Sequence, residues 1–169
     1  MSNENQEEIA TILEQTEKLD FLIQSLVKLS RMESGIIAVH SEDTTIKQML
    51  ESIQQQFNVK VREKNITLSL CDTDLHIRCD SKWTVEALGN IVDNAIKYTA
   101  CGGNVQIKVE QYSFFVKIDI IDDGIGIEKE EIPKIFGRFY RSLSVADQPG
   151  VGIGLFLARE IIQAQKGYI

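Results

Sequence analysis

Four polar side chains share one face of a predicted helix in the stretch NIVDNAIKYT, residues 90–99. They occupy positions i, i+4, i+7 and i+8, which stacks them along one side of an α-helix: Asn90, Asn94, Lys97 and Tyr98. Asparagine is a weak helix former because its amide competes for nearby backbone groups. A stripe with two asparagines therefore indicates either an ordinary solvated surface or a set of ligands, and the stripe alone leaves both open.

The stretch DDGIGI is a second candidate site, because a predicted strand ends at Asp122 and Gly124 and Gly126 follow it. A carboxylate buried at a strand end can accept a hydrogen bond from an exocyclic amine such as that of adenine. Glycine residues allow the backbone and a base to approach closely. An ordinary acidic turn is the alternative interpretation.

A third candidate site, GVGIGL, begins the last predicted helix and contains Gly150, Gly152 and Gly154. Glycines at a helix N-terminus leave backbone N–H groups free to bind an anion. The stretch is not a Rossmann fingerprint, since its spacing is GxGxG and no strand directly precedes it. It also lacks the Gly-Lys-Ser/Thr of a P-loop. Alone, it is a weak signal for phosphate binding.

Composition restricts the partners. The net charge of −7 argues against nucleic acid as the main partner, because phosphate neutralisation needs a basic patch.

Cys71, Cys79 and Cys101 are odd in number and show no CxxC spacing, which favours reduced thiols over a disulfide or zinc site. No apolar run approaches the roughly 18 residues of a membrane span, and no signal-peptide pattern begins the chain. We therefore expect a cytoplasmic location.

The first 35 residues predict a separate helix that ends at Gly35. Its apolar face is broader than the narrow seam of a coiled coil, which favours a helical bundle that pairs with a second chain. The alternative is that the helix folds back onto its own domain. The residues of the face are Ile9, Ile12, Leu13, Thr16, Leu19, Leu22, Ile23, Leu26, Val27, Leu29 and Ser30.

Residues 36–169 predict an α+β fold, a two-layer sandwich in which helices cover one face of a mixed sheet. The predicted elements, in order, are an apolar run at 36–39, a helix capped by Asp43 or Thr44, strands at 65–70 and 75–79, a helix that includes 90–98, hairpin strands at 104–110 and 114–121, a short helix at 130–136, a polar segment at 141–148 and a last helix at 154–165.

The order and spacing of these stretches resemble the catalytic ATP-binding domain of sensor histidine kinases, which belongs to the same superfamily as gyrase B, Hsp90 and MutL. NIVDNAIKYT is similar to the N box of this family, DDGIGI to its G1 box and GVGIGL to its G2 box. IFGRFYR, residues 135–141, is similar to its F box. The first helix resembles the second helix of the family's dimerisation and phosphoacceptor domain.

The resemblance implies ATP and Mg²⁺ as cofactors. Asn94, with Asn90 beside it, would bind Mg²⁺, which keeps several of its waters and needs few protein oxygens. Asp122 would bind the adenine amine. The other implied contacts are Lys97 to phosphate oxygens, Tyr98 near the ribose or adenine edge, Gly124 and Gly126 around the base, Arg141 and Arg138 to the γ-phosphate from a lid at 141–148, and Gly150, Gly152, Gly154 and Leu155 at the phosphates. Phe136 and Phe139 would anchor the lid to the core.

Asn90 bears on the reaction. Superfamily members that activate water carry glutamate at the matching position, and an amide cannot accept a proton as a general base. The resemblance therefore favours phosphoryl transfer to an external nucleophile, with Asn90, Lys97 and Arg141 as the catalytic residues. An ATP-hydrolysing clamp and a nucleotide-binding dimerisation module without catalysis are the alternatives.

The acceptor histidine of the family lies on a helix that precedes the one at the start of this chain. His40 lies beyond Gly35 and His76 lies in a predicted strand, so neither fits the acceptor. The family also continues beyond KGYI with a further strand or two, so a sheet edge is expected to be exposed. The implied partners are a second copy through the first helix, the phosphoacceptor helix and a response regulator, with membrane segments only outside this chain.

Overall fold

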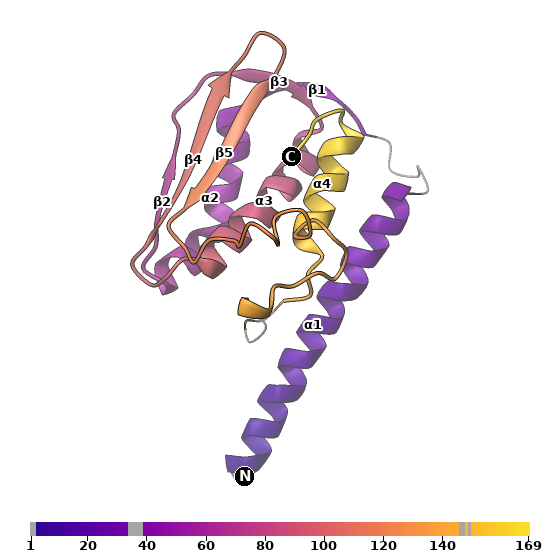
Figure 1. Ribbon diagram of the computed structural model, residues 1–169, viewed down its shortest axis with the longest axis vertical. Coiled ribbons are helices and arrows are strands. Elements are labelled where there is room, and N and C mark those ends of the chain that lie inside the picture. The colour runs from indigo at the N-terminus through magenta and orange to yellow at the C-terminus, as the bar shows by residue number, and fades with distance from the viewer. Residues whose placement is uncertain (1–2, 34–38, 146–147, 149) are drawn as a thin grey trace.

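The computed structural model describes residues 3–33, 39–145, 148 and 150–169 (Figure 1). The elements in order are α1 (Asn3–Glu33), β1 (Glu42–Thr45), α2 (Ile46–Glu63), β2 (Thr67–Leu70), β3 (His76–Cys79), α3 (Ser81–Tyr98), β4 (Asn104–Gln111), β5 (Val116–Asp122), the 3-10 turn η1 (Leu143–Val145) and α4 (Gly154–Ala164). The boundary predicted at residue 35 lies outside the described residues.

The predicted mixed sheet is confirmed. Its strand order is β2-β4-β5, with β2 parallel to β4 and β4 antiparallel to β5. The predicted hairpin spans the register from Val105 opposite Asp122 to Gln111 opposite Val116. β1 and β3 form a separate antiparallel pair. In the described part of the chain, β5 is an edge of the larger sheet.

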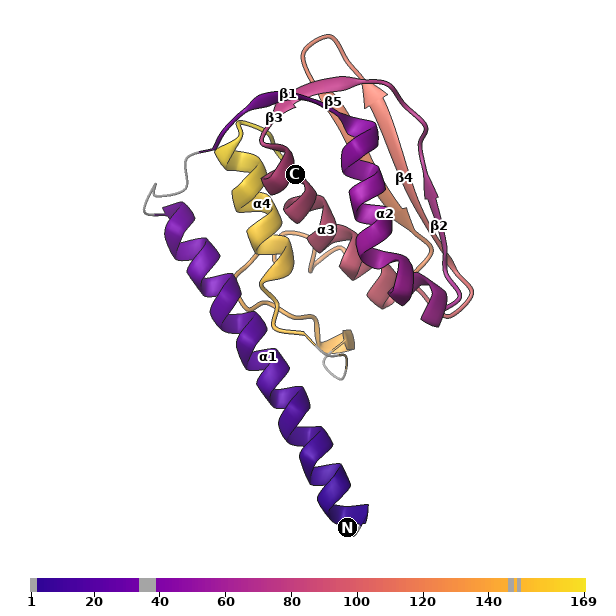
Figure 2. The ribbon, with the colours of Figure 1, turned by 180° about the vertical axis from the view of Figure 1, so that it is seen from behind.

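The helices lie in layers on one side of the sheet. Figures 1 and 2 show α2 and α3 next to the sheet, α4 beyond α3, and the long helix α1 alongside α4. α2 turns its apolar stripe inward as predicted: Ile46, Met49, Leu50, Ile53 and Phe57 are all buried. Burying such side chains contributes about 1.5–3 kcal/mol each. This two-layer α+β arrangement agrees with the predicted fold class.

α3 begins at a cap and carries both core and polar residues. The Asp80 side chain accepts a hydrogen bond from the Trp83 backbone N–H at 3.1 Å, which satisfies one unpaired donor of the first turn. Val92 and Ile96 are buried against the sheet side of the core. The helix ends at Tyr98, because Thr99 adopts an extended backbone conformation with a φ of −73° and a ψ of 138°.

α1 contacts the globular part while leaving most of its apolar face uncovered. Leu22 packs against a second core cluster between α3 and α4, Ser25 is buried, and Lys28 pairs with Glu86 of α3 at 2.6 Å. The exposed large apolar residues of α1 are Ile9, Ile12, Leu13, Leu19, Ile23, Leu26 and Val27. Fold-back therefore accounts for part of the predicted face and leaves the rest available to another chain. Among the described residues, no helix has the length and apolar character needed to cross a membrane.

Several local predictions were wrong. The predicted helix at 130–136 is a series of turns, because Pro133 has no backbone N–H to continue a helical ladder. Asp43 and Thr44 lie in β1 instead of capping α2, whose N-cap is Thr45 without a side-chain bond. The predicted apolar run at 36–39 is not tested, because residues 36–38 lie outside the described part. The predicted last helix is confirmed, since α4 spans Gly154–Ala164 and Gln165 is its C-cap.

The cysteine prediction is confirmed. Cys71, Cys79 and Cys101 are all free thiols. Burial raises the pKa of the Cys79 thiol above its ordinary value, which keeps it protonated at neutral pH. Cys79 therefore acts as a small apolar core residue at the end of β3.

Candidate functional site

A cavity of about 840 Å³ lies between α3, the segment after β5 and the start of α4. Its volume suits a small-molecule ligand. The residues of the predicted site that line it are Asn90, Asn94, Lys97, Tyr98, Asp122, Gly124, Gly126, Arg141, Gly150, Gly152, Gly154 and Leu155. The tertiary structure thus brings three separate stretches of the sequence to one place.

The two asparagines of the polar stripe are half-buried on the cavity side of α3. The Asn90 Nδ2 donates to the Glu86 backbone carbonyl at 2.9 Å, which fixes the rotation of the amide. A Cβ added at Gly154 would lie 3.2 Å from Asn90 Oδ1, so the amide oxygen points at the first residue of α4. The stripe is therefore a cavity wall and not a solvated surface.

Lys97 lies where the end of α3 meets the glycine turn before α4. Its Nζ donates to the Tyr98 hydroxyl oxygen at 3.0 Å and lies 4.7 Å from the centroid of the Tyr98 ring. A Cβ at Gly150 would approach this Nζ to 2.8 Å. The ammonium group is therefore within reach of any anion held by the glycine turn.

Asp122 ends β5 at the rim of the cavity. One of its oxygens, Oδ1, accepts a hydrogen bond from the Gly124 backbone N–H at 3.0 Å. The carboxylate is exposed, which corrects the expectation of a buried one, because the cavity opens to solvent at this strand end. A Cβ at Gly124 would lie 2.7 Å from the Tyr98 carbonyl oxygen. Only glycine allows this segment to contact the end of α3.

The turn before α4 also needs glycine. Gly152 has a φ of 75°, and a Cβ there would lie 2.5 Å from the Tyr140 carbonyl oxygen. The N-cap residue of α4 is Ile153, whose side chain makes no capping hydrogen bond. The first-turn N–H groups of α4 are thus without a side-chain cap beside the cavity, which favours binding of an anion.

The two arginines differ in position. The Arg141 guanidinium lines the cavity and donates to the Val145 carbonyl at 2.8 Å and to the Gln148 carbonyl, so it binds the backbone of the lid segment. Arg138 is not among the cavity-lining residues. Its guanidinium stacks on the Phe156 ring at 4.7 Å. The structure therefore does not bring Arg138 to the cavity with the other predicted residues.

The two phenylalanines of the F box also differ in position, one at the cavity and one at the surface. Phe136 lines the cavity, with the Arg159 guanidinium 5.8 Å from its ring centroid. Phe139 is 55% exposed and has a φ of 60°. Burial of Tyr140, followed by its hydrogen bond to Glu131, raises the pKa of the Tyr140 hydroxyl above its ordinary value, so this group stays protonated at neutral pH.

Sequence reasoning missed the contribution of α2 to the site. Gln56, Phe57 and Lys60 line the cavity opposite α3, and Lys60 pairs with Asp93 at 2.6 Å. These residues precede the N-box stretch by about thirty positions and carry no motif. The apolar stripe of α2 orients that helix against α3, and it was the one sequence feature that indirectly indicated a contribution of α2 to the site. In the part of the chain that the structure describes, no three His, Cys, Asp or Glu side chains are grouped to hold a metal ion.

Comparisons with known proteins agree with this geometry. Residues 79–169 match the family described as histidine kinase-, DNA gyrase B-, and HSP90-like ATPase. The chain is 32% identical over 160 residues to the sensor histidine kinase WalK of Bacillus subtilis, covering 92% of this chain and 26% of that protein. It is 28% identical over 153 residues to the sensor protein kinase PmrB of Pseudomonas aeruginosa, covering 90% and 32%. The chain thus spans about a quarter to a third of the length of these relatives.

Solved structures give the same result. The histidine kinase AdeS of Acinetobacter baumannii superimposes with a TM-score of 0.76 at 26% identity, over 92% of this chain and 72% of that one. The mycobacterial sensor histidine kinase MprB gives a TM-score of 0.66 at 26% identity, over 75% and 81%. Because the family match covers more than half of the residues and includes every wall of the cavity except α2, this chain belongs to the histidine kinase-, DNA gyrase B- and HSP90-like ATPase family.

Proposed function

We propose that this chain binds Mg-ATP in the cavity and donates the γ-phosphoryl group to a histidine on a helix outside this chain, as the kinase core of a two-component sensor. The observation that carries the proposal is the meeting of three motifs, from α3, the end of β5 and the start of α4, around one cavity of about 840 Å³. Kinship with sensor histidine kinases supports the choice of reaction.

The residues present fit an adenine nucleotide and Mg²⁺. Gly124 and Gly152 let two walls of the cavity pack directly against neighbouring backbone, because a Cβ at these positions would come within 2.7 Å and 2.5 Å of the Tyr98 and Tyr140 carbonyl oxygens. The cavity offers the amides of Asn90 and Asn94 as neutral oxygen ligands, which suits an ion that takes most of its ligands from water and phosphate. Bound Mg²⁺ would neutralise charge on the triphosphate.

Each wall of the cavity has a proposed role. Asp122 would accept a hydrogen bond from the adenine amine through the carboxylate oxygen that Gly124 leaves free. Tyr98 would lie near the ribose or the adenine edge. Lys97 and the uncapped N-terminus of α4, from Gly150 to Leu155, would hold the phosphates. Arg141 would reach the γ-phosphate after exchanging its lid carbonyl partners for phosphate oxygens.

Asn90 sets the reaction apart from hydrolysis. Its amide is held by the Glu86 carbonyl and cannot accept a proton from water. The carboxylate on the same helix, Glu86, is paired with Lys28 at 2.6 Å. With an amide at position 90 and the Glu86 carboxylate paired with Lys28, catalysis would rest on positioning of the γ-phosphate by Lys97 and Arg141 and on stabilisation of its charge.

The uncovered apolar face of α1 supports a homodimer as one proposed partner. The phosphoacceptor helix and a response regulator are the others, with the chain in the cytoplasm and any membrane segment elsewhere in the full protein. The same apolar face also supports a second candidate function, a nucleotide-binding dimerisation module without catalysis.

A transfer assay distinguishes these functions. The chain is incubated with γ-labelled Mg-ATP, alone and with a polypeptide that carries the acceptor helix of a related kinase. We expect little hydrolysis and little self-labelling by the chain alone, and an acid-labile, base-stable phosphorylated product when the acceptor is added. Asn94→Ala should abolish the transfer and the gain in ATP affinity from Mg²⁺, while ATP binding in chelator persists.

Two results contradict the kinase proposal. Brisk hydrolysis by the chain alone would indicate an ATPase of the clamp type. Tight Mg-ATP binding without labelling of any matched acceptor would indicate a binding module.

A further inference from the structure

Lys64 binds the C-terminal end of α3 from the neighbouring helix. Its Nζ donates to the backbone carbonyls of Ile96, Lys97 and Thr99 at 2.9, 2.7 and 2.9 Å. An ammonium group has three donors, and the last carbonyls of a helix have no partner within the helix. The three donors of Lys64 therefore match three acceptors at the negative end of the α3 dipole.

The backbone around Lys64 holds this side chain in place. Lys64 is half-buried and forms the C-cap of α2, where its N–H donates to the Lys60 carbonyl at 3.1 Å. Its own carbonyl accepts from the Gly102 N–H at 3.0 Å, in the turn between α3 and β4. Asn65 follows with a φ of 53°, a left-handed conformation that asparagine tolerates. One residue thus connects α2 to both sides of the turn that follows α3.

The end of α3 that Lys64 holds is also part of the nucleotide cavity. Lys97 and Tyr98 form its last turn, and both line the cavity. The Tyr98 carbonyl lies so close to Gly124 that a Cβ there would come within 2.7 Å of the carbonyl oxygen. The Gly124 N–H in turn donates to Asp122. A shift of the last turn of α3 would therefore move the phosphate lysine and the base-binding turn together.

We propose that Lys64 is a positioning residue for nucleotide binding, because it fixes the last turn of α3 against the segment that carries Asp122. Lys64 does not line the cavity and acts through Lys97, Tyr98 and Gly124. The role rests on the proposed function of the cavity as an ATP site. A purely structural role would lower the stability of the fold without changing nucleotide affinity in the folded protein.

Two substitutions test the role. Lys64→Met keeps an unbranched side chain and removes all three donors, whereas Lys64→Arg keeps a cation with several N–H donors. By calorimetric titration well below each melting temperature, we expect Lys64→Met to weaken Mg-ATP binding about tenfold or more, as loss of a charged hydrogen-bonding group would. Lys64→Arg should restore most of the affinity.

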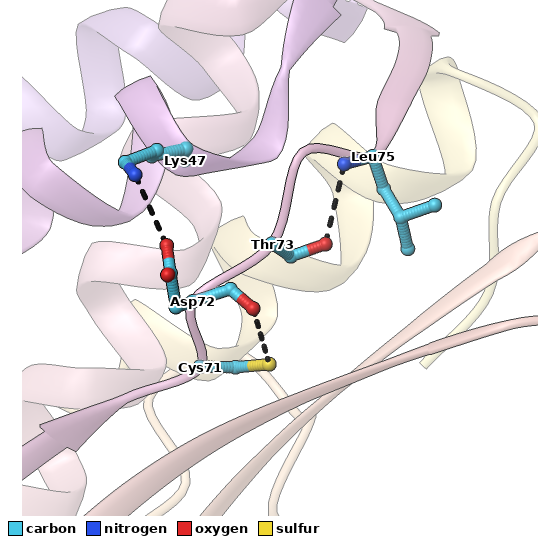
Figure 3. A network of polar contacts seen from close by, with 5 residues as sticks. All are labelled: Lys47, Cys71, Asp72, Thr73 and Leu75. Carbon is cyan, nitrogen blue, oxygen red and sulfur yellow. Dashed lines mark hydrogen bonds and ion pairs between the residues drawn. The ribbon is translucent and has the colours of Figure 1, made fainter.

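Lys47→Met is the matched control. Lys47 lies at the start of α2 and makes one ion pair, with Asp72 at 3.0 Å, at the exposed loop before β3 (Figure 3). The same substitution there removes an ammonium from the same helix without touching α3 or the cavity. We expect unchanged Mg-ATP affinity for Lys47→Met.

Amide hydrogen exchange supplies a second measurement. In Lys64→Met, exchange at the end of α3, from Lys97 to Thr99, should become faster, while exchange at Leu50 and Ile53 in α2 should match the wild type. In the unmodified protein, the ammonium protons of Lys64 should exchange slowly enough to give a nitrogen-correlated NMR signal. Absence of that signal would contradict the proposal even if Lys64→Met failed to fold.

The outcomes separate this role from the function on which it rests. Wild-type binding of Mg-ATP, together with an unaffected Lys64→Met variant, overturns the positioning role alone, whatever happens to the melting temperature. A wild-type chain that binds no Mg-ATP overturns the ATP site, and the proposed role of Lys64 with it.

Discussion

Two neighbouring carboxylates follow one another at the end of β5, and their hydrogen bonds separate their roles. Asp123 accepts from the backbone N–H and the side-chain amide of Asn104, at 2.9 and 2.8 Å. Asp122 accepts from Gly124 through one oxygen and faces the cavity. Asp123 therefore bonds the start of β4, whereas Asp122, the residue singled out in the sequence, lines the cavity.

The first prediction tests this separation. Asp122→Asn replaces an acceptor with a donor opposite the adenine amine, and we expect ATP binding to weaken about ten- to a hundredfold, or roughly 1–3 kcal/mol. Preference for ATP over GTP should fall in the same variant. Asp123→Asn serves as the control and should leave that preference unchanged. Calorimetric titration with both nucleotides measures the effect, and equal loss in the two variants would count against the assignment.

The second prediction concerns the pH dependence of stability. The backbone N–H of Asn104, and then its side-chain amide, hold the pKa of Asp123 below its ordinary value of 3.8. A carboxyl whose pKa is lower in the folded state stabilises the fold above pH 3.8, and this contribution is lost as the pH falls through the folded pKa. Asp123→Asn should therefore lower the free energy of unfolding at pH 7, and the difference from wild type should shrink below pH 3.8. Urea unfolding at several pH values tests this, and a difference independent of pH would contradict it.

At the scale of elements, the turn that precedes α4 is held by contacts with the F-box segment. Gly152 is both left-handed and in close contact with the Tyr140 carbonyl. Gly126, in the turn after β5, is left-handed with a φ of 72°, but a Cβ there would meet nothing within 4 Å. Alanine at Gly126 would therefore introduce backbone strain alone, whereas alanine at Gly152 would introduce strain together with a steric clash.

The third prediction compares alanine at these two positions. Gly126→Ala should cost only the strain of a left-handed alanine, about 1 kcal/mol. Gly152→Ala should cost more, because its Cβ would also push Tyr140 away from the start of α4, and ATP binding should weaken further. Urea unfolding and nucleotide titration of both variants provide the measurement. A smaller loss of stability for Gly152→Ala than for Gly126→Ala would contradict the prediction. It would indicate that the F-box segment can move away from an added Cβ at little cost in stability.

At the scale of the whole molecule, α1 has two different surfaces. Its Leu22 and Lys28 contact the α3–α4 layer, and Lys28 reaches Glu86, whose backbone carbonyl orients Asn90. The large apolar side chains of α1 from Ile9 to Leu19, together with Ile23, Leu26 and Val27, are exposed where the structure describes them. Glu86 thus contacts both α1 and the first asparagine of the polar stripe.

The fourth prediction concerns association through α1. Leu19 is 57% exposed, and Leu19→Glu should shift a dimer to monomer by placing a charge in the apolar face. Gln15→Glu adds the same charge at another exposed position of α1 outside that apolar set, and should leave association unchanged. Sedimentation velocity at increasing concentration measures the state of each variant. Nucleotide affinity should be equal in both, and a wild-type chain that stays monomeric at all concentrations would contradict the prediction.

Sequence periodicity correctly predicts the buried faces of α2 and β4. The stripe of α2 from Ile46 to Phe57 and the alternation of Val105 and Ile107 in β4 predict the core correctly, because side-chain periodicity follows from backbone geometry. The family resemblance, confirmed by the comparisons, was read from short motifs whose glycines and polar residues are local in sequence. Features that depend on residues close together in the sequence, such as a buried stripe or a glycine motif, were therefore predictable.

Contacts between residues far apart in the sequence could not be predicted from periodicity. Pairing of β2 with β4 across the whole of α3, the exposure of Asp122 and the placement of Arg138 on Phe156 all depend on long-range packing. Lys64 shows the reason most clearly. Its position at the end of α2 indicates a cap for its own helix, yet its ammonium caps α3, some thirty residues later in the chain. Periodicity describes one element at a time, and contacts between elements are fixed only when the core is packed.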